Sequence, residues 1–230
     1  MKQFLTLFLI IAALCTANAK TDIFRINVAD FSGLTVVDGI GVDYFCLPDS
    51  AGWAVFECEP SVAPHIMFTN KKNHLTIQSD AEDAPIEGLP RVKVYSNALA
   101  KVENSGDSLL IVHTTVPVQS FKVKQIGNGS IIVDHIESKT MDIGITAGKG
   151  SIRIAGKTDK ASISNVSTGP IDATGLSVAD VKCTVFGPGN IRVTPSSRLT
   201  IYGAGSGQIL FRTKPDKISN RSIGVKSNFE

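Results

Sequence analysis

The sequence predicts an all-β protein built as a β-solenoid, with an antiparallel strand region at its N-terminal end. After the first twenty residues, no long segment repeats apolar residues at helical spacing, whereas apolar and polar residues alternate in segments such as RVKVYSNALAKVE (91–103) and FKVKQI (121–126). A short glycine motif also recurs about every twenty residues. One β-rich unit per repeat indicates coils that stack on one another and share a continuous core.

The first nineteen residues have the three parts of a signal peptide. Lys2 precedes an apolar run from Phe4 to Leu14, and Ala17-Asn18-Ala19 forms the cleavage site. Cys15 follows Leu14 rather than a small residue, which argues against lipidation. The apolar run is shorter than the roughly 20 residues of a transmembrane helix. We therefore expect a Sec-type signal peptide at 1–19 and export to the periplasm, the outer surface or the medium.

The exported part, residues 20–230, has the length of a single all-β domain without a transmembrane segment. The whole chain has 23 basic and 21 acidic residues. This near-neutral balance gives no indication of a nucleic acid or an anionic membrane surface as a partner.

The segment from about 24 to 89 predicts strands joined by turns. Its alternating stretches are FRINVADF, LTVVDGIGVDYFCL, GWAVFECEP and NHLTIQSD. The loop SDAEDAPIEGLP (79–90), which contains two prolines and four acidic residues, then separates these strands from repeat coils at about 91–227.

Each repeat unit places a glycine directly before a strand, as in GNGSI, GKGSI and GPGNI. A side chain at a coil corner would meet the adjacent coil, and the corner often needs positive φ, so glycine is expected there. The isoleucine that begins each strand is expected to point inward and to stack on its equivalents at 131, 152, 171, 191 and 209. The structural repeat glycines are Gly106, Gly129, Gly150, Gly169, Gly189 and Gly207.

Two other functions of glycine-rich motifs do not fit. A nucleotide-binding loop needs its glycines between a strand and a helix, and here another strand follows each motif. Calcium-binding nonapeptide repeats need a G-G-x-G-x-D pattern at short period, which this sequence lacks.

Three cysteines remain after the predicted signal peptide, so at most one internal disulfide is possible. Cys46 and Cys58 flank a predicted hairpin turn at 48–52 and could share a sheet face, which would allow a bridge between them. The alternative is that Cys46, Cys58 and Cys183 are all small buried side chains. The sequence leaves both possibilities open.

The succession of these motifs resembles the head GIN domain family of auto-transporter adhesins, and Gly189-Asn190-Ile191 contains the tripeptide of its name. The resemblance extends from about Phe24 to about Lys226. It includes FSGLTVVDGIGVDYFCL near the start and YGAGSGQILFRTKPDKISNRSIGV near the end. Two repeats depart from the pattern, at 167–169 and 222–224. The resemblance implies a right-handed, pectin-lyase-like β-helix, an envelope or surface setting and a role in adhesion, and it implies no catalytic residues.

The residue types that catalyse reactions or bind metals lack the spacing that these functions require. His65, His74, His113 and His135 stand singly, and the cysteines lack a C-x-x-C spacing, so neither a metal site nor a cofactor is expected. Acidic residues of the repeats fall at different phases, which does not build the paired carboxylates of a glycosidase. These residues are Asp107, Asp134, Glu137, Asp142, Asp159, Asp172, Asp180 and Asp216.

The acidic loop and the single tryptophan are further candidates for binding. The acidic loop residues Asp80, Glu82, Asp83 and Glu87 are interpreted as a solvated loop, with a weak cation site as the alternative. Trp53, the one tryptophan, is the weak candidate for a binding residue as a sugar-stacking platform. Its alternative role is to close a hydrophobic cluster at the end of the solenoid.

These observations predict an exported, non-catalytic β-solenoid that serves as a cell-envelope adhesion or ligand-binding module, with an extracellular glycan or an envelope protein as partner. The alternatives are a polysaccharide-active enzyme on a β-helix scaffold and a structural envelope scaffold that binds another protein. The fold by itself does not decide among them.

Overall fold

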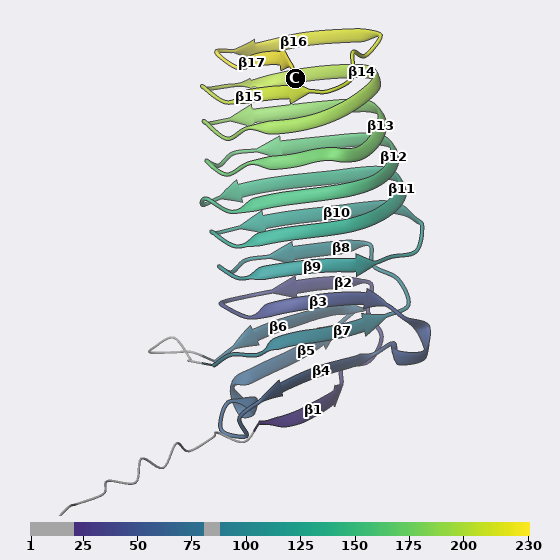
Figure 1. Ribbon diagram of the computed structural model, residues 1–230, viewed down its shortest axis with the longest axis vertical. Coiled ribbons are helices and arrows are strands. Elements are labelled where there is room, and N and C mark those ends of the chain that lie inside the picture. The colour runs from purple at the N-terminus through teal and green to yellow at the C-terminus, as the bar shows by residue number, and fades with distance from the viewer. Residues whose placement is uncertain (1–20, 81–87) are drawn as a thin grey trace, which may run out of the picture.

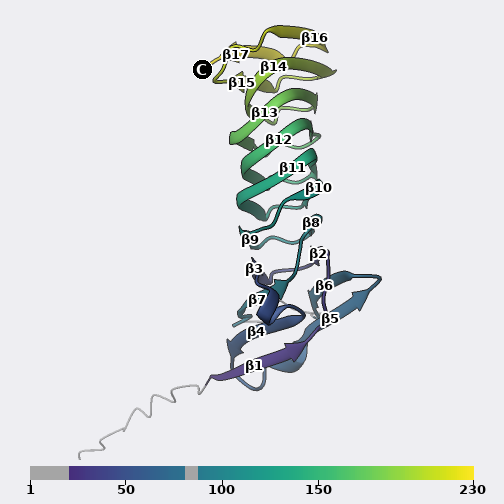
Figure 2. The same cartoon turned by 90° about the vertical axis from the view of Figure 1, so that its right-hand side faces the viewer.

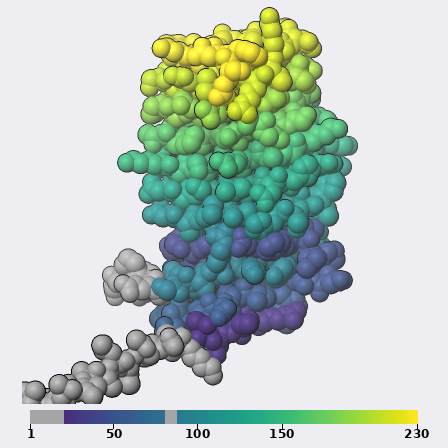
Figure 3. All heavy atoms as spheres, viewed as in Figure 1, coloured from purple at the N-terminus to yellow at the C-terminus, as the bar shows by residue number. Residues whose placement is uncertain are grey.

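The protein forms a tall column of stacked β coils, which confirms the predicted all-β solenoid (Figure 1). This computed structural model describes residues 21–80 and 88–230. The predicted signal peptide at 1–19 and the loop residues Glu82, Asp83 and Glu87 lie outside the described residues. Figure 3 shows the coils packed on one another as a continuous column up to the C-terminal end.

The described chain contains seventeen strands and two short 3-10 helices. The strands of the N-terminal half are β1 (Asp22–Asn27), β2 (Gly33–Val36), β3 (Gly41–Cys46), β4 (Trp53–Cys58), β5 (Ile66–Lys71), β6 (His74–Ser79), β7 (Arg91–Ser96), β8 (Lys101–Asn104) and β9 (Leu109–Thr114). The remaining strands are β10 (Val118–Ile126), β11 (Ser130–Ala147), β12 (Ser151–Asn165), β13 (Ile171–Phe186), β14 (Ile191–Ala204), β15 (Gln208–Phe211), β16 (Lys217–Ile223) and β17 (Lys226–Phe229). The 3-10 helices are η1 (Pro48–Ser50) and η2 (Ala63–His65).

All strands belong to one hydrogen-bonded sheet, which is folded into two faces because β11, β12, β13 and β14 each bend half-way (Figure 2). The β10 face contains, in spatial order, β5, β6, β2, β8, β10, the second halves of the four long strands, and β16. The β9 face contains β1, β4, β7, β3, β9, the first halves of the long strands, β15 and β17. Tight corners join the two faces on one side, and the bends join them on the other.

The order of the coils in space differs from their order in the chain. The coil made by β2 and β3 lies between the coil of β6 and β7 and the coil of β8 and β9. The early segment LTVVDGIGVDYFCL is therefore already part of the parallel stack. Coil order then follows the chain from β8 to the C-terminus.

Antiparallel strands close the N-terminal end of the column, as predicted for this region. On the β9 face β1 pairs with β4 and β4 pairs with β7, and on the β10 face β5 pairs with β6, all antiparallel. The parallel stacking therefore ends here, and the last strand of each face at this end, β1 or β5, is antiparallel to its neighbour. At the C-terminal end β16 and β17 continue the parallel pattern and each pairs on one side only.

Inward-facing residues at equal positions in successive coils form ladders that fill the space between the two faces. The isoleucines at 131, 152, 171, 191 and 209 are register partners, and each is at most 1% exposed. Burying each such side chain contributes roughly 1.5–3 kcal/mol, and the β-branched shape suits stacking between strands. Val42 and Leu110 extend the same ladder toward the N-terminus.

The repeat glycines lie one above another at the corners because the coils approach too closely for a side chain. A Cβ atom added to Gly169 would overlap the carbonyl oxygen of Gly150, and one added to Gly129 would overlap the carbonyl of Gly106. Positive φ is a separate requirement, met by the first glycine of each pair, such as Gly148 at φ 87°.

Buried amide side chains support corners that have a single glycine. Asn165 Nδ2 donates to the Gly169 carbonyl at 2.8 Å, and Asn165 Oδ1 accepts from the Ser167 backbone N–H at 3.0 Å. Asn104 makes the equivalent bonds to Ser108 and Gly106. This explains how the repeat at 167–169 keeps its corner although it departs from the two-glycine pattern.

All three cysteines of the described chain are free thiols, so the possible Cys46–Cys58 bridge is not formed. β3 and β4 do not pair as a hairpin, because β7 lies between them. Cys46 is at the η1 end of this three-strand group, whereas Cys58 ends β4 five residues further along, roughly 16 Å away along the strand. Burial raises the pKa of Cys183 to about 12.

Gly169→Ala is predicted to destabilise the protein by about 3 kcal/mol, because the new methyl group must displace the backbone of the preceding coil. Gly144→Ala is the matched control, since its Cβ would meet nothing closer than the Ser164 carbonyl at 3.6 Å. Urea unfolding of both variants measures the difference. Equal stability of the two variants would contradict the role assigned to the corners.

Candidate functional site

Trp53 lies on the outer surface of the β9 face and belongs to a row of aromatic side chains. Its cross-strand partner is Tyr95 on β7, and Tyr95 in turn pairs with Phe45 on β3. The Phe45 ring stacks on Tyr95 at a centroid distance of 5.7 Å and on His113 of β9 at 4.7 Å. We call Trp53, Tyr95, Phe45 and His113 the aromatic ladder.

The rings of the aromatic ladder use their faces for contacts with neighbours. Both faces of Phe45 are covered, by Tyr95 at an interplanar angle of 23° and by His113 at 16°. The guanidinium carbon of Arg25 lies 4.2 Å from the centre of the Trp53 ring, a cation–π geometry that occupies one of its faces. A sugar ring that stacks on Trp53 from this side must displace Arg25.

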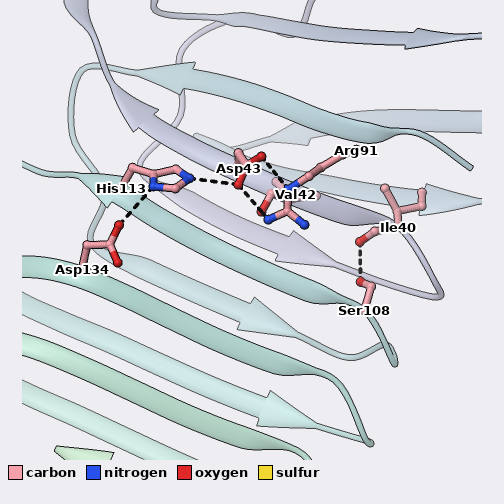
Figure 4. Close-up of polar contacts among 7 residues, drawn as sticks. All are labelled: Ile40, Val42, Asp43, Arg91, Ser108, His113 and Asp134. Atoms are coloured by element: carbon pink, nitrogen blue, oxygen red, sulfur yellow. Dashed lines mark hydrogen bonds and ion pairs between the residues drawn. The ribbon is translucent and has the colours of Figure 1, made fainter.

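Figure 4 shows a polar network around His113, the β9 member of the aromatic ladder. Arg91 on β7 donates to both oxygens of Asp43 on β3, with Nε to Oδ2 at 2.5 Å and Nη2 to Oδ1 at 2.7 Å. His113 Nε2 contacts Asp43 Oδ1 at 3.0 Å, and His113 Nδ1 contacts Asp134 Oδ2 at 3.0 Å. The network joins strands from four successive coils and fixes the His113 ring against Phe45.

The carboxylate of Asp43 is well stabilised in its charged form. Burial by itself raises its pKa, but the hydrogen bonds and charges of Arg91 and His113 outweigh this effect and hold the pKa below its ordinary value of 3.8. Both ring nitrogens of His113 and both oxygens of Asp43 are engaged within the network. These groups therefore connect the strands of the network, and neither His113 nor Asp43 is left free to act as a general acid or base.

The other histidines each contact one polar neighbour. His65 Nδ1 lies 2.8 Å from Asp80, the described end of the predicted acidic loop, and His74 Nε2 lies 2.8 Å from the Thr35 hydroxyl. His135 lies 3.6 Å from Glu137. Within residues 21–80 and 88–230, no group of three or more His, Cys, Asp or Glu side chains is arranged to hold a metal ion.

The C-terminal half of the β10 face carries an excess of positive charge on its outer surface. Register places Lys160, Asp180, Arg198 and Lys217 in one row across β12, β13, β14 and β16. Neighbouring rows add Lys182 and Arg221. We call the five basic residues, together with Asp180, the basic face.

The charges of the basic face lack ion-pair partners. None of its five cations forms an ion pair with a carboxylate of the described chain. Nearer the N-terminus the same surface is neutralised, because Lys122 pairs with Asp142 at 3.0 Å and Glu103 pairs with two lysines. On the β9 face, Asp172 lies in register between two arginines.

A shallow depression of about 430 Å³ lies within the basic face. Lys160, Lys182 and Arg198 line it with Asp180, and hydroxyl groups between the cations come from Thr140, Ser162 and Thr200. The lysines and the arginine supply hydrogen-bond donors only, whereas the hydroxyl groups both donate and accept. This arrangement suits non-covalent binding of a ligand that carries negative charges and hydroxyl groups.

Alternation with apolar residues along the strand indicates that Lys182 points outward, but it does not indicate that the cations of the basic face cluster. Lys160, Asp180, Arg198 and Lys217 recur at intervals of 20, 18 and 19 residues, and that spacing is the signal that could have revealed a shared surface. The Asp43–His113 contact spans 70 residues and depends on the inserted β2–β3 coil, so the repeat pattern contains no sign of it.

The sequence matches the family described as "Putative auto-transporter adhesin, head GIN domain" over residues 30–215. The chain belongs to this family. The match covers both the parallel coils of the N-terminal half and the glycine repeats, and it starts and ends slightly inside the range expected from the sequence. No curated protein matches the chain.

Solved structures share the head GIN domain fold along their whole length. A "putative adhesin" from Bacteroides fragilis is 16% identical, with a TM-score of 0.78 over 91% of this chain and 97% of its own. A "putative lipid binding protein" from Parabacteroides distasonis is 18% identical, with a TM-score of 0.74 over 92% and 98%. A second Parabacteroides distasonis protein, a "putative adhesin", is 24% identical, with a TM-score of 0.70 over 92% and 98%. At these identities the likeness shows the fold.

The family's description indicates an adhesion-type protein of the cell envelope or surface. In the part of the chain that the structure describes, no helix is long and apolar enough to cross a membrane.

Asp43→Asn is predicted to destabilise this head GIN domain by about 2 kcal/mol at neutral pH, because Arg91 loses a charged bidentate partner. The pKa of Asp43 is lowered in the folded state, so its contribution is complete above 3.8 and is lost as pH falls through the folded-state pKa. Urea unfolding from neutral pH to below pH 4 should show wild type losing stability toward that of the variant.

Asp134→Asn is the matched control for this network. Its carboxylate is 49% exposed and contacts His113 alone, so the expected loss is below about 1 kcal/mol. A loss at Asp134 as large as that at Asp43 would refute the central position given to Asp43.

Proposed function

We propose that the protein is a non-catalytic, cofactor-free binding module of the cell envelope that holds an extended ligand on the outer surface of its solenoid. Membership of an adhesin family supports the envelope role. The observation that carries the proposal is the array of outward side chains. Because the strands pair in parallel and in register, equivalent outward residues of successive coils form straight rows along the column. Neighbouring positions in a row are about 4.8 Å apart, a spacing suited to a ligand that is itself repetitive.

One row shows why an extended ligand suits this surface. Lys124, Gly144, Ser164, Thr184, Tyr202 and Arg221 are consecutive register partners on the β10 face. Small and hydroxyl-bearing residues occupy its middle, and a tyrosine and cations occupy its ends. Such a path is flat enough for a glycan or peptide strand to lie along the column, and its hydroxyl groups can bond sugar hydroxyls.

The enzyme alternative receives little support from the site. A glycosidase needs two carboxyl groups facing one bond from opposite sides. In the Asp43 network the two carboxylates contact opposite nitrogens of His113, and that imidazole separates them. We infer that the network stabilises the coils instead of acting on a substrate.

A glycan array with residues 20–230 tests the proposed function, run beside Trp53→Ala and beside a β10-face variant, Thr184→Met. We expect glycan binding that Thr184→Met reduces at least tenfold, because a longer, uncharged side chain obstructs the row and removes a hydroxyl group from it. Turnover should be absent on polymers of uronic acids. Binding that is lost in Trp53→Ala and kept in Thr184→Met would relocate the site to the aromatic ladder, and release of oligosaccharides would establish an enzyme.

A second candidate function, a scaffold for another protein chain, is favoured by the C-terminal end of the column. β16 and β17 leave one edge each without a partner strand in the described chain. Ile218, Ile223 and Phe229 are 43%, 80% and 64% exposed there. An open edge with apolar side chains is a template for a strand from another protein.

Site-specific photo-crosslinking from position 223 tests the scaffold function in the envelope fraction of the source organism. The matched control position is Ile23 on β1, which is 74% exposed at the opposite end of the column. We expect one defined protein to cross-link from 223 and not from 23. Identical products from both positions, or none from 223, would remove the basis for this function.

A further inference from the structure

We propose that the basic face binds an anionic polysaccharide, one whose sugar units carry carboxylate groups. This inference rests on the proposed binding function and adds the class of ligand and the side chains that recognise it. None of the five cations of the basic face forms an ion pair with a carboxylate of the described chain, so its charge is available to a ligand.

Comparison with the β9 face shows that the excess charge is specific to this surface. In the equivalent coils of the β9 face, Arg153 and Arg192 lie on either side of Asp172, whose carboxylate also accepts from the Thr174 hydroxyl at 2.7 Å. Cations there alternate with a half-buried, hydrogen-bonded carboxylate. On the basic face a single carboxylate, Asp180, stands among five cations.

The positions of the cations favour a long anion over a small one. Lys160 and Lys217 are separated by three strand spacings, roughly 14 Å, with Arg198 between them. Lys182 lies in the adjacent row, on β13. A single phosphate or sulfate ion reaches only part of this set, whereas a chain with a charge on each unit reaches all of it.

The side chains between the cations fit a sugar backbone. Ser162 and Thr200 flank Lys182 in its row and line the depression of about 430 Å³. Their hydroxyl groups can exchange hydrogen bonds with ring hydroxyls, while the cations make charge-assisted bonds to carboxylates. Lys182 Nζ lies 5.2 Å from the centre of the Tyr202 ring, which keeps the ammonium group over the surface rather than free in solvent.

Three outward cations elsewhere on the same coils provide a matched control. Lys139, Lys149 and Lys157 are exposed and lie outside the basic face, at the bends and at a corner. Replacing them with alanine changes the net charge by the same amount as replacing Lys160, Lys182 and Arg198. Any difference between the two triple variants reports the position of the charges and not their number.

The experiment is affinity electrophoresis and calorimetry of residues 20–230 with polygalacturonate, and with its fully methyl-esterified form as the uncharged ligand of equal backbone. We expect binding to polygalacturonate, no binding to the ester, and weakening with added salt. K160A/K182A/R198A should raise the Kd at least tenfold, and K139A/K149A/K157A should leave it within twofold. Thermal unfolding of each variant verifies that the fold is kept.

Several outcomes would overturn the proposal. Equal loss in both triple variants would show unspecific attraction, and equal binding of the ester would show that charge is irrelevant. Binding to vesicles with anionic headgroups, without binding to the polysaccharide, would identify a lipid surface instead. Binding of neutral glycans without binding of polygalacturonate would refute this inference but leave the proposed function standing. Absence of binding to any glycan would contradict both.

Discussion

The close approach of backbones at the coil corners is the constraint on which the rest of the structure depends. Coils hydrogen-bonded in register lie about 4.8 Å apart, and at the corner the carbonyl of one coil occupies the place where the next would carry a Cβ atom. Glycine at 129, 150, 169, 189 and 207 accepts this contact. Because each corner begins the next strand at the same phase, the inward isoleucines stack and the outward residues align in rows.

Inward and outward positions of the coils are constrained differently. Inward positions are occupied by apolar ladders and by amides that support the corners, so their identity is dictated by packing. Outward positions carry few packing demands and are available for binding. The two outer faces differ accordingly: the aromatic ladder and the Asp43 network tie the N-terminal coils together, whereas the basic face leaves its cations uncommitted.

The two ends of the column are also unlike, for a topological reason. The chain forms the β2–β3 coil first and then returns below it to form β6 and β7, with β1, β4 and β5 as antiparallel strands at the end. This arrangement stops the parallel stack at the N-terminus. At the other end, β16 and β17 each pair on one side only within the described chain, and Ile223 and Phe229 beside this edge are exposed.

Particular residues show where prediction from sequence reached its limit. Ile152 and Ile171 could be placed in the core because their position relative to the glycine repeats every coil, and local spacing sets their direction. The aromatic ladder could not be foreseen, since Trp53, Tyr95 and Phe45 meet only through a β7 strand inserted between β3 and β4. The same insertion separates Cys46 from Cys58, which excludes the bridge that a simple hairpin would have allowed.

The sequence by itself determined the fold class, the repeat, the corner glycines and the inward ladder, because these depend on periodicities of two residues and of about twenty. Only the tertiary structure decided the order of the coils, the Asp43–His113 contact and the clustering of Lys160, Lys182 and Arg198. The physical reason is that register between strands far apart in the chain selects which outward side chains become neighbours. Alternation within one strand specifies that a side chain points outward, but not what lies beside it.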